Sequence, residues 1–113
     1  MEFSTSLKLN HIFRRLYATS GHANTYLVLY ARRNRSKENR VGLTCGKKLG
    51  HAVVRNRARR RLREVYRLNG GALKQGYDII LVARTRTVKV SWQELNDTFV
   101  KLCRKLELLG DKP

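Results

Sequence analysis

The pattern of hydrophobic and polar positions predicts helices and strands along the whole chain. Between about residues 10 and 18, apolar side chains recur every three or four positions behind a possible cap at Asn10, which predicts a short helix. Two runs of aromatic and aliphatic residues, Tyr26 to Ala31 and Val41 to Cys45, have the length of strands. A short basic connection joins them, so we expect these strands to form an antiparallel pair.

The second half of the chain predicts two longer helices around one strand. The first helix runs from about Ala52 to Leu68 and is closed by Gly70 and Gly71. The segment from Tyr77 to Ala83 is an almost unbroken apolar run, as expected of a central strand covered on both faces. We therefore expect the three strands to form one sheet with this segment inside it.

The last helix is predicted from its start signal and its apolar stripe. Ser91 and Glu94 have the spacing of a capping box, and Val90 and Leu95 can form the hydrophobic staple beside it. The packed stripe is expected to consist of Leu95, Phe99, Leu102, Leu106 and Leu109.

Composition favours a single folded domain over residues 1–113. Hydrophobic residues make up 42% of the chain, enough for a core. The sequence has no signal-peptide pattern and no apolar run of the roughly 18 residues that span a membrane, so we expect a cytoplasmic protein. Cys45 and Cys103 lie far apart without metal-ligand spacing, and we interpret both as small buried hydrophobic residues.

Charge adds a candidate function to this fold. Lys and Arg number 25 against 8 Asp and Glu, a formal charge of +17 that attracts polyanions. Seven arginines lie between Arg55 and Arg67, and their planar guanidinium groups suit phosphate. At 100° per residue, the expected apolar arc holds Val54, Ala58, Leu62, Val65 and Leu68, and the far side holds Asn56, Arg59, Arg60, Arg63 and Arg67. The predicted partner is a nucleic acid.

Catalytic chemistry is not predicted for the protein itself. The three histidines, His11, His22 and His51, are scattered. No pairing of His, Asp or Glu suggests acid-base or two-metal nuclease chemistry. We predict neither catalytic residues nor a metal site.

One segment carries a resemblance to a known family. The sequence from Arg40 to Thr44, the pair Lys47 and Lys48, and the segment from Ala52 to Glu64 with its Arg-Asn-Arg motif resemble the signature of the bacterial ribonuclease P protein subunit. The resemblance extends to Phe13 and Tyr17, to the first strand, and to the segment that begins at Tyr77, Asp78, Ile79 and Ile80.

The resemblance implies an α/β fold of the α+β two-layer sandwich type, similar to domain 2 of ribosomal protein S5. The element order would be helix, strand, strand, helix, strand, helix, with a possible extra short strand. Crossovers between parallel strands are right-handed in about 98% of cases. The resemblance nevertheless implies a left-handed crossover here.

The implied function is that of the accessory protein subunit of ribonuclease P, an endonuclease that removes the 5′ leader from precursor tRNA. The RNA subunit would be the catalyst, with Mg²⁺ held through the RNA and no cofactor bound by the protein alone. The implied partners are the ribonuclease P RNA and precursor tRNA, with no membrane and no protein partner required.

The resemblance also assigns residues to two surfaces. The residues expected to bind the catalytic RNA are Lys47, Lys48, Arg55, Asn56, Arg57, Arg59, Arg60 and Arg63. Phe13, Tyr17 and Tyr30 would line a cleft for the single-stranded leader, where aromatic faces stack on bases of any sequence.

Several residue assignments stay open at this point. Phe13 lies on an apolar stripe and can equally be core, and Tyr17 likewise. Either Tyr26 or Tyr30 can face RNA while the other packs. Arg61 stands near the apolar arc where the family usually has an aliphatic residue, so either its side chain reaches outward or the helix is rotated.

Two other functions fit the same charge. A general or ribosomal RNA-binding protein would bind many RNAs without affecting tRNA processing. A DNA-binding module would place the arginine helix in the major groove, although Gln, Asn or Ser side chains that read bases are scarce beside the arginines.

Overall fold

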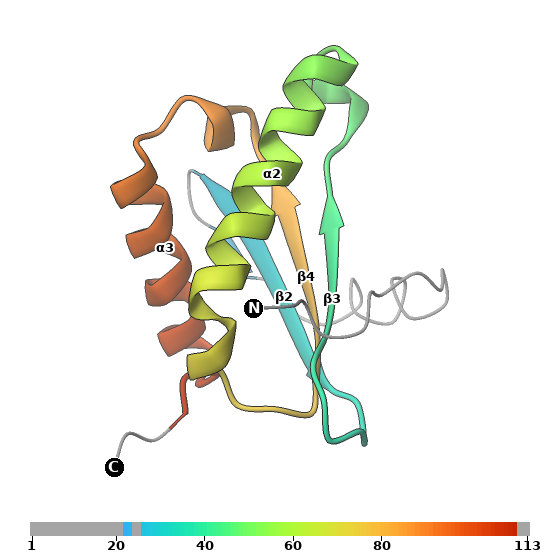
Figure 1. Ribbon diagram of the computed structural model, residues 1–113, viewed down its shortest axis with the longest axis vertical. Coiled ribbons are helices and arrows are strands. Elements are labelled where there is room, and N and C mark those ends of the chain that lie inside the picture. The colour runs from blue at the N-terminus through green and yellow to red at the C-terminus, as the bar shows by residue number, and fades with distance from the viewer. Residues whose placement is uncertain (1–21, 24–25, 111–113) are drawn as a thin grey trace.

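The computed structural model describes residues 22–23 and 26–110, which form a four-stranded sheet with two helices packed on one face (Figure 1). This confirms the α+β class. The helix expected at residues 10–18 lies outside the described residues. The strands and helices are β1 (His22–Ala23), β2 (Leu27–Arg33), β3 (Arg40–Thr44), α2 (Ala52–Asn69), β4 (Tyr77–Ala83) and α3 (Trp92–Lys105), and the 3-10 helices are η1 (Lys47–Leu49), η2 (Gly70–Ala72) and η3 (Thr85–Val88).

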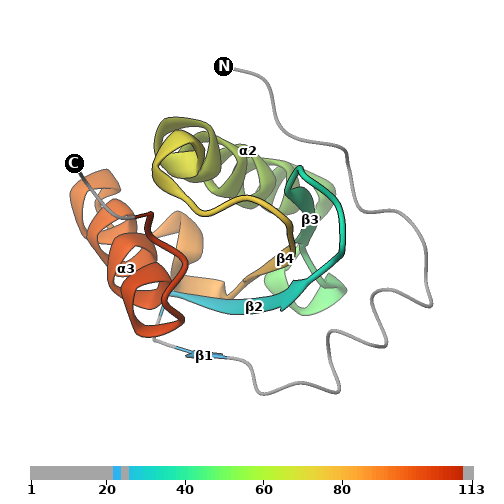
Figure 2. The ribbon, with the colours of Figure 1, turned by 90° about the horizontal axis from the view of Figure 1, so that it is seen from below.

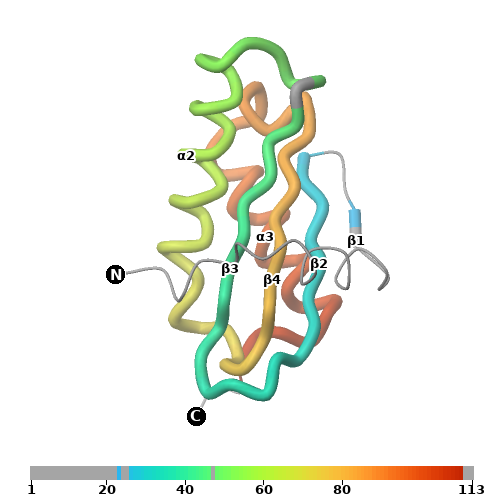
Figure 3. Tube along the Cα trace, turned by 90° about the vertical axis from the view of Figure 1, so that its right-hand side faces the viewer, coloured from blue at the N-terminus to red at the C-terminus, as the bar shows by residue number. Residues whose placement is uncertain are grey.

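The strand order is β1-β2-β4-β3, so the predicted pairing of β2 with β3 is wrong. The strand β4 lies between them, antiparallel to β2 and parallel to β3 (Figure 3). Its central position agrees with its apolar sequence. Arg33 lies opposite Tyr77, and Arg40 lies opposite Asp78. The end of β2 and the start of β3 therefore flank the start of β4.

The connection between β2 and β3 crosses the start of β4, which explains why the two strands do not form a hairpin. The Asn34 N–H donates to the Gly76 carbonyl oxygen at 2.9 Å. A Cβ atom at Gly76 would lie 2.9 Å from the Ser36 carbonyl oxygen, and φ there is +92°. Glycine is required at this crossing because any side chain would collide with the loop.

The crossover from β3 through α2 to β4 is left-handed. Viewed with α2 in front of the sheet, the chain leaves β3, descends through α2 and enters β4 to the left of β3 (Figure 1). This is the hand that the resemblance implies. Both α2 and α3 lie on the same side of the sheet (Figure 2).

The core lies between the sheet and these two helices. Leu27 and Leu29 of β2 and Ile79 and Leu81 of β4 are fully buried and belong to one cluster with side chains of both helices. Because strand side chains alternate between faces, the even-numbered residues of β2 and β4 point to the opposite face of the sheet. On that second face Ile80 is fully buried and Tyr30 is half-buried.

The helix α2 has nearly the bounds predicted for it. Its buried residues are Ala58, Leu62, Val65 and Tyr66. Leu68, which was predicted to be buried, is 54% exposed. It lies about 100° around the helix from the middle of the buried arc, and Tyr66 packs into the core in its place.

The helix α3 begins at the predicted cap and ends earlier than predicted. The Ser91 hydroxyl accepts from the Glu94 N–H at 3.2 Å, and Leu95, Phe99 and Leu102 are buried as expected. The helix stops at Lys105, where the chain turns through a left-handed conformation at Glu107 (φ 58°). Leu109 therefore lies beyond the helix and pairs with Leu73 in an isolated bridge, so its placement on the helical stripe is wrong.

The two cysteines differ in burial, so the prediction of two buried residues is confirmed only for Cys103. Burial raises the pKa of Cys103 to about 12. Cys45 is half-buried at the end of β3, and its pKa is raised by desolvation, partly offset by the nearby charges of Arg59 and Arg55.

We expect a thiol reagent at pH 8 to modify Cys45 faster than Cys103, which should react only as the protein unfolds, because the thiolate is the reactive form and Cys103 is the more deeply buried thiol. The measurement is the rate of modification at each site by mass spectrometry, in the native protein and in urea. Equal native rates at the two sites would contradict the burial of Cys103. Cys45→Ser serves as the control that assigns the fast phase.

Candidate nucleic-acid interface

The beginning of α2 concentrates positive charge. Its first turn has no acidic residue, and the N-cap residue His51 makes no side-chain cap. The first N–H groups of a helix have no internal partner and lie at the positive end of the helix dipole. Lys48 in the preceding η1 is exposed, and Lys47 lies in the same turn, although its side chain is outside what the structure describes. Together these features attract anions.

The outward face of α2 carries three exposed arginines, Arg57, Arg60 and Arg63, beside the exposed Asn56. Arg57 and Arg60 have no carboxylate partner among the described residues. Like charges at this spacing repel one another by a few tenths of a kcal/mol per pair. An external polyanion would offset that repulsion.

Two further arginines of the predicted site lie at the flank of α2 next to β3. Arg59 is half-buried, not on the far side as predicted, and its Nη1 donates to Asn56 Oδ1 at 3.3 Å. Arg55 is also half-buried, and within the described part of the chain its Nε is buried without a partner. The charges of both act on Cys45 at the end of β3. The α2 part of the predicted site is therefore divided between an outward face and this flank.

Arg61 lies on the opposite flank and has a structural role that the sequence did not reveal. Its Nη1 donates to the carbonyl oxygens of Thr87 at 2.7 Å and Val90 at 2.6 Å. The helix is also slightly rotated from the predicted orientation, because Tyr66 is buried and Leu68 is exposed, so the buried arc lies further from Arg61. Arg61 therefore joins α2 to η3 and to the residue before the cap of α3. The only sequence signal was its place at the border of the apolar arc.

Arg67 forms an ion pair with Glu64 on the same helix. Its Nε donates to both oxygens of Glu64 at 3.1 Å. This hydrogen bond from Arg67 lowers the pKa of Glu64 below its usual value. The charge of Arg67 is offset locally, unlike that of Arg57 and Arg60.

The predicted leader cleft can be placed only in part. Phe13 and Tyr17 lie outside the described residues. Tyr30 is half-buried in β2, opposite Ile80 of β4, on the sheet face away from the helices. The aromatic ring of Tyr30 is therefore on a different surface from the arginines of α2.

Tyr26 is one of the two tyrosines whose roles the sequence leaves open, and which of them faces RNA stays a prediction. It packs against the core cluster, and its hydroxyl donates to Glu94 Oε2 at 2.9 Å. This hydrogen bond raises the pKa of Tyr26. Glu94 therefore binds Tyr26, and no spacing in the sequence indicated this contact between residues 68 positions apart.

The described ranges 22–23 and 26–110 contain neither a candidate metal site nor a candidate membrane-spanning helix. No group of three or more His, Cys, Asp and Glu side chains there could hold a metal ion. No helix in the same ranges is long and apolar enough to cross a membrane.

Comparison with known proteins decides the family. The family model described as Ribonuclease P matches residues 1–107. The chain belongs to the ribonuclease P protein family. The ribonuclease P protein component of Natranaerobius thermophilus is 44% identical over 105 residues, which cover 92% of this chain and 91% of that protein. The component of Alkaliphilus oremlandii is 41% identical over 111 residues, 97% of each chain.

Solved ribonuclease P proteins also have this fold. The Staphylococcus aureus protein superimposes with a TM-score of 0.80 at 26% identity, covering 93% of this chain and 97% of its own. The Thermotoga maritima protein superimposes with a TM-score of 0.78 at 26% identity, covering 88% of this chain and 96% of its own. The chain is thus a ribonuclease P protein, whose partner is ribonuclease P RNA and whose role lies in tRNA 5′ processing.

Proposed function

We propose that this chain binds the catalytic RNA of ribonuclease P through η1 and α2, and so assists removal of the 5′ leader from precursor tRNA in the cytoplasm. The observation that carries this proposal is the outward face of α2. There Arg57 and Arg60 are exposed and lack a described carboxylate partner. Arg63, Asn56 and Lys48 extend the same surface, and guanidinium groups bind phosphate oxygens in a bidentate way.

In this proposal the RNA is the catalyst, and Mg²⁺ held through the RNA would supply the charge stabilisation that phosphodiester hydrolysis needs. The chemistry of the described carboxylates supports this division. Asp78 is bound by Arg40, Glu64 by Arg67, and Glu94 by Tyr26. These three carboxylates are already engaged by donors of the protein. In this proposal the protein contributes binding, with no cofactor and no protein partner of its own.

The second part of the proposal places the single-stranded leader on the sheet face that carries Tyr30, together with Phe13 and Tyr17. Aromatic rings stack on bases for about 1 to 3 kcal/mol each, with little dependence on sequence. Binding on this face would increase the affinity for precursor tRNA over mature tRNA, because only the precursor has a leader.

The decisive experiment is cleavage of a 5′-extended precursor tRNA by a bacterial ribonuclease P RNA at low Mg²⁺, with and without the protein. We expect the protein to restore cleavage at the mature 5′ end, because its cations replace part of the screening that Mg²⁺ provides. Absence of stimulation by folded protein across several RNA types would favour a general RNA-binding protein. Tight, sequence-specific binding to duplex DNA would instead favour the DNA-binding alternative.

We expect Tyr30→Leu to weaken the holoenzyme's affinity for precursor tRNA about tenfold and to leave its affinity for mature tRNA unchanged, since one stacking contact is lost. The measurement is equilibrium binding of both tRNAs in Ca²⁺. Tyr26→Phe is the matched control, because the hydroxyl that it removes donates to Glu94 of α3, on the helical side of the sheet. Equal losses for both tRNAs would assign Tyr30 to packing.

A further inference from the structure

The loop between β2 and β3 carries a second concentration of positive charge that α2 does not explain. Arg32, Arg33, Arg35 and Lys37 fall within six residues, and all four are exposed. We call residues 32–37 the basic loop. It lies at the end of the sheet where β3 starts, whereas η1 and the first turn of α2 lie at the end where β3 finishes (Figures 1 and 3).

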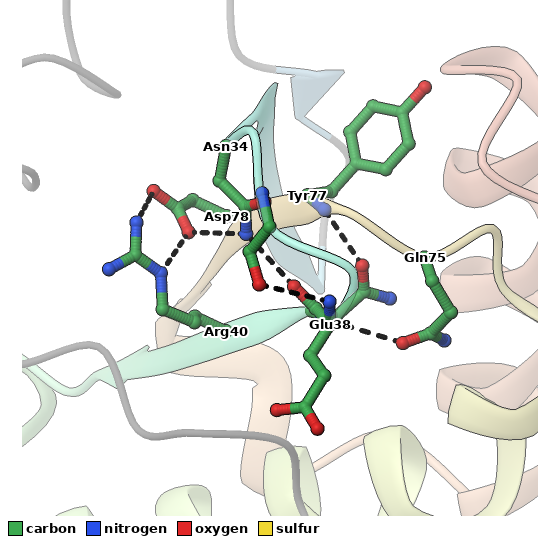
Figure 4. Close-up of polar contacts among 8 residues, drawn as sticks. Asn34, Glu38, Arg40, Gln75, Tyr77 and Asp78 are labelled. Carbon is green, nitrogen blue, oxygen red and sulfur yellow. Dashed lines mark hydrogen bonds and ion pairs between the residues drawn. The ribbon is translucent and has the colours of Figure 1, made fainter.

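Side-chain hydrogen bonds hold the basic loop in one conformation (Figure 4). Asn34 Nδ2 donates to Asp78 Oδ1 and to the Glu38 carbonyl oxygen, both at 3.0 Å. Asn34 Oδ1 accepts from the Ser36 N–H at 2.7 Å. The fully buried Asn39 accepts from the Tyr77 N–H at 2.8 Å. A surface ordered in this way loses little conformational entropy when it binds a partner.

The nearest buried carboxylate does not neutralise this loop. Asp78 is 7% exposed and receives two hydrogen bonds from Arg40, at 2.7 and 2.8 Å. Within the described ranges, Arg35 and Lys37 have no acidic partner. The charge of the loop is therefore directed to solvent.

Arg35 has a left-handed backbone conformation, as Glu107 has after α3. Its φ is 65°, in the left-handed region, where glycine or asparagine is favoured and other residues are strained. An arginine at this position therefore carries a conformational cost that asparagine would lower.

We propose that the basic loop is a second phosphate-binding site, which contacts ribonuclease P RNA at a different place from α2. The proposal rests on the proposed function, which supplies the RNA. The 18 residues of α2 span about 27 Å, and the two sites lie near its opposite ends. That separation exceeds the screening length of about 8 Å at physiological salt, so each site releases counterions independently.

The test is direct binding of the protein to ribonuclease P RNA over a range of salt concentrations, with hydroxyl-radical footprinting of the RNA. The loop variant is Arg35→Asn with Lys37→Gln. The control is Lys101→Gln with Arg104→Gln, which removes two exposed charges from α3. We expect the loop variant to bind about tenfold more weakly at 0.15 M salt, with a salt slope lower by about 1.5, and the control to bind like the wild type.

Stability separates this effect from misfolding. Asparagine tolerates the left-handed conformation better than arginine, so the thermal midpoint of the loop variant should be no lower than that of the wild type. The loop variant should also lose protection of RNA nucleotides that Arg57→Ala leaves protected. Weaker RNA binding without a lower thermal midpoint is not expected if the loop has only a structural role.

Three results would overturn the proposal. The first is wild-type affinity in the loop variant, and the second is loss of the same RNA footprint as in Arg57→Ala. The third is an equal loss of affinity in the α3 control, which would indicate only a general electrostatic field. Because binding is measured without tRNA or cleavage, a protein that binds RNA through the loop but fails to stimulate cleavage would contradict the proposed function and not this inference.

Discussion

Replacing both Arg57 and Arg60 with alanine is expected to weaken binding to ribonuclease P RNA about 30-fold at 0.15 M salt. Each exposed guanidinium group should contribute about 1 kcal/mol through a charge-assisted contact with phosphate, and 1.4 kcal/mol corresponds to a tenfold change in affinity. The slope of log affinity against log salt should fall by about 0.7 to 0.9 for each lost contact. The measurement is a binding titration at several salt concentrations.

The stability of the same variant should change in the opposite direction. Alanine has the highest helix propensity, and the substitution removes repulsion between like charges on one face of α2. We therefore expect the free energy of unfolding to stay the same or rise. The control is Lys101→Ala with Arg104→Ala, two exposed residues of α3. An unchanged salt slope in the α2 variant would remove this face from the interface.

Replacing Phe99 with alanine is expected to lower the free energy of unfolding by about 3 to 5 kcal/mol. Phe99 is fully buried in the cluster between the sheet and both helices, and its removal leaves a cavity. Domains of this size have total stabilities of about 5 to 15 kcal/mol, and the formal charge of +17 adds self-repulsion. The measurement is urea unfolding at low and high salt.

Two controls make the Phe99 result specific. Phe99→Leu keeps most of the volume and should cost less than the alanine variant. Saturating ribonuclease P RNA should raise the thermal midpoint of Phe99→Ala, because a ligand that binds only the folded state stabilises it. A loss below 1 kcal/mol for the alanine variant would contradict the central place of Phe99 in the core.

The sequence predicted that arginines form the interface, but it did not predict which contacts each arginine makes. Seven arginines on one helix predict a phosphate-binding surface. Arg61 nevertheless donates to two backbone carbonyls, and Arg67 pairs with Glu64. Both outcomes depend on which groups lie next to the helix, and helical periodicity does not contain that information.

The pairing of the strands shows the same limit for the fold. Adjacent strands with a short connection usually form a hairpin, yet β4 lies between β2 and β3. The insertion depends on Gly76 passing under the loop at Ser36. It also depends on hydrogen bonds from β4 to both neighbours, which come from a segment more than 30 residues later in the chain.

Local sequence patterns were enough to predict the approximate bounds of α2, the capped start of α3, the central place of β4 and the positive charge of the arginine helix. These follow from local periodicity, capping and composition, which act over a few residues. Three features could not be predicted in this way: the strand order, the hydrogen bond between Tyr26 and Glu94, and the division of the arginines between solvent and structural contacts. Those features depend on contacts between distant segments, which only the folded chain brings together.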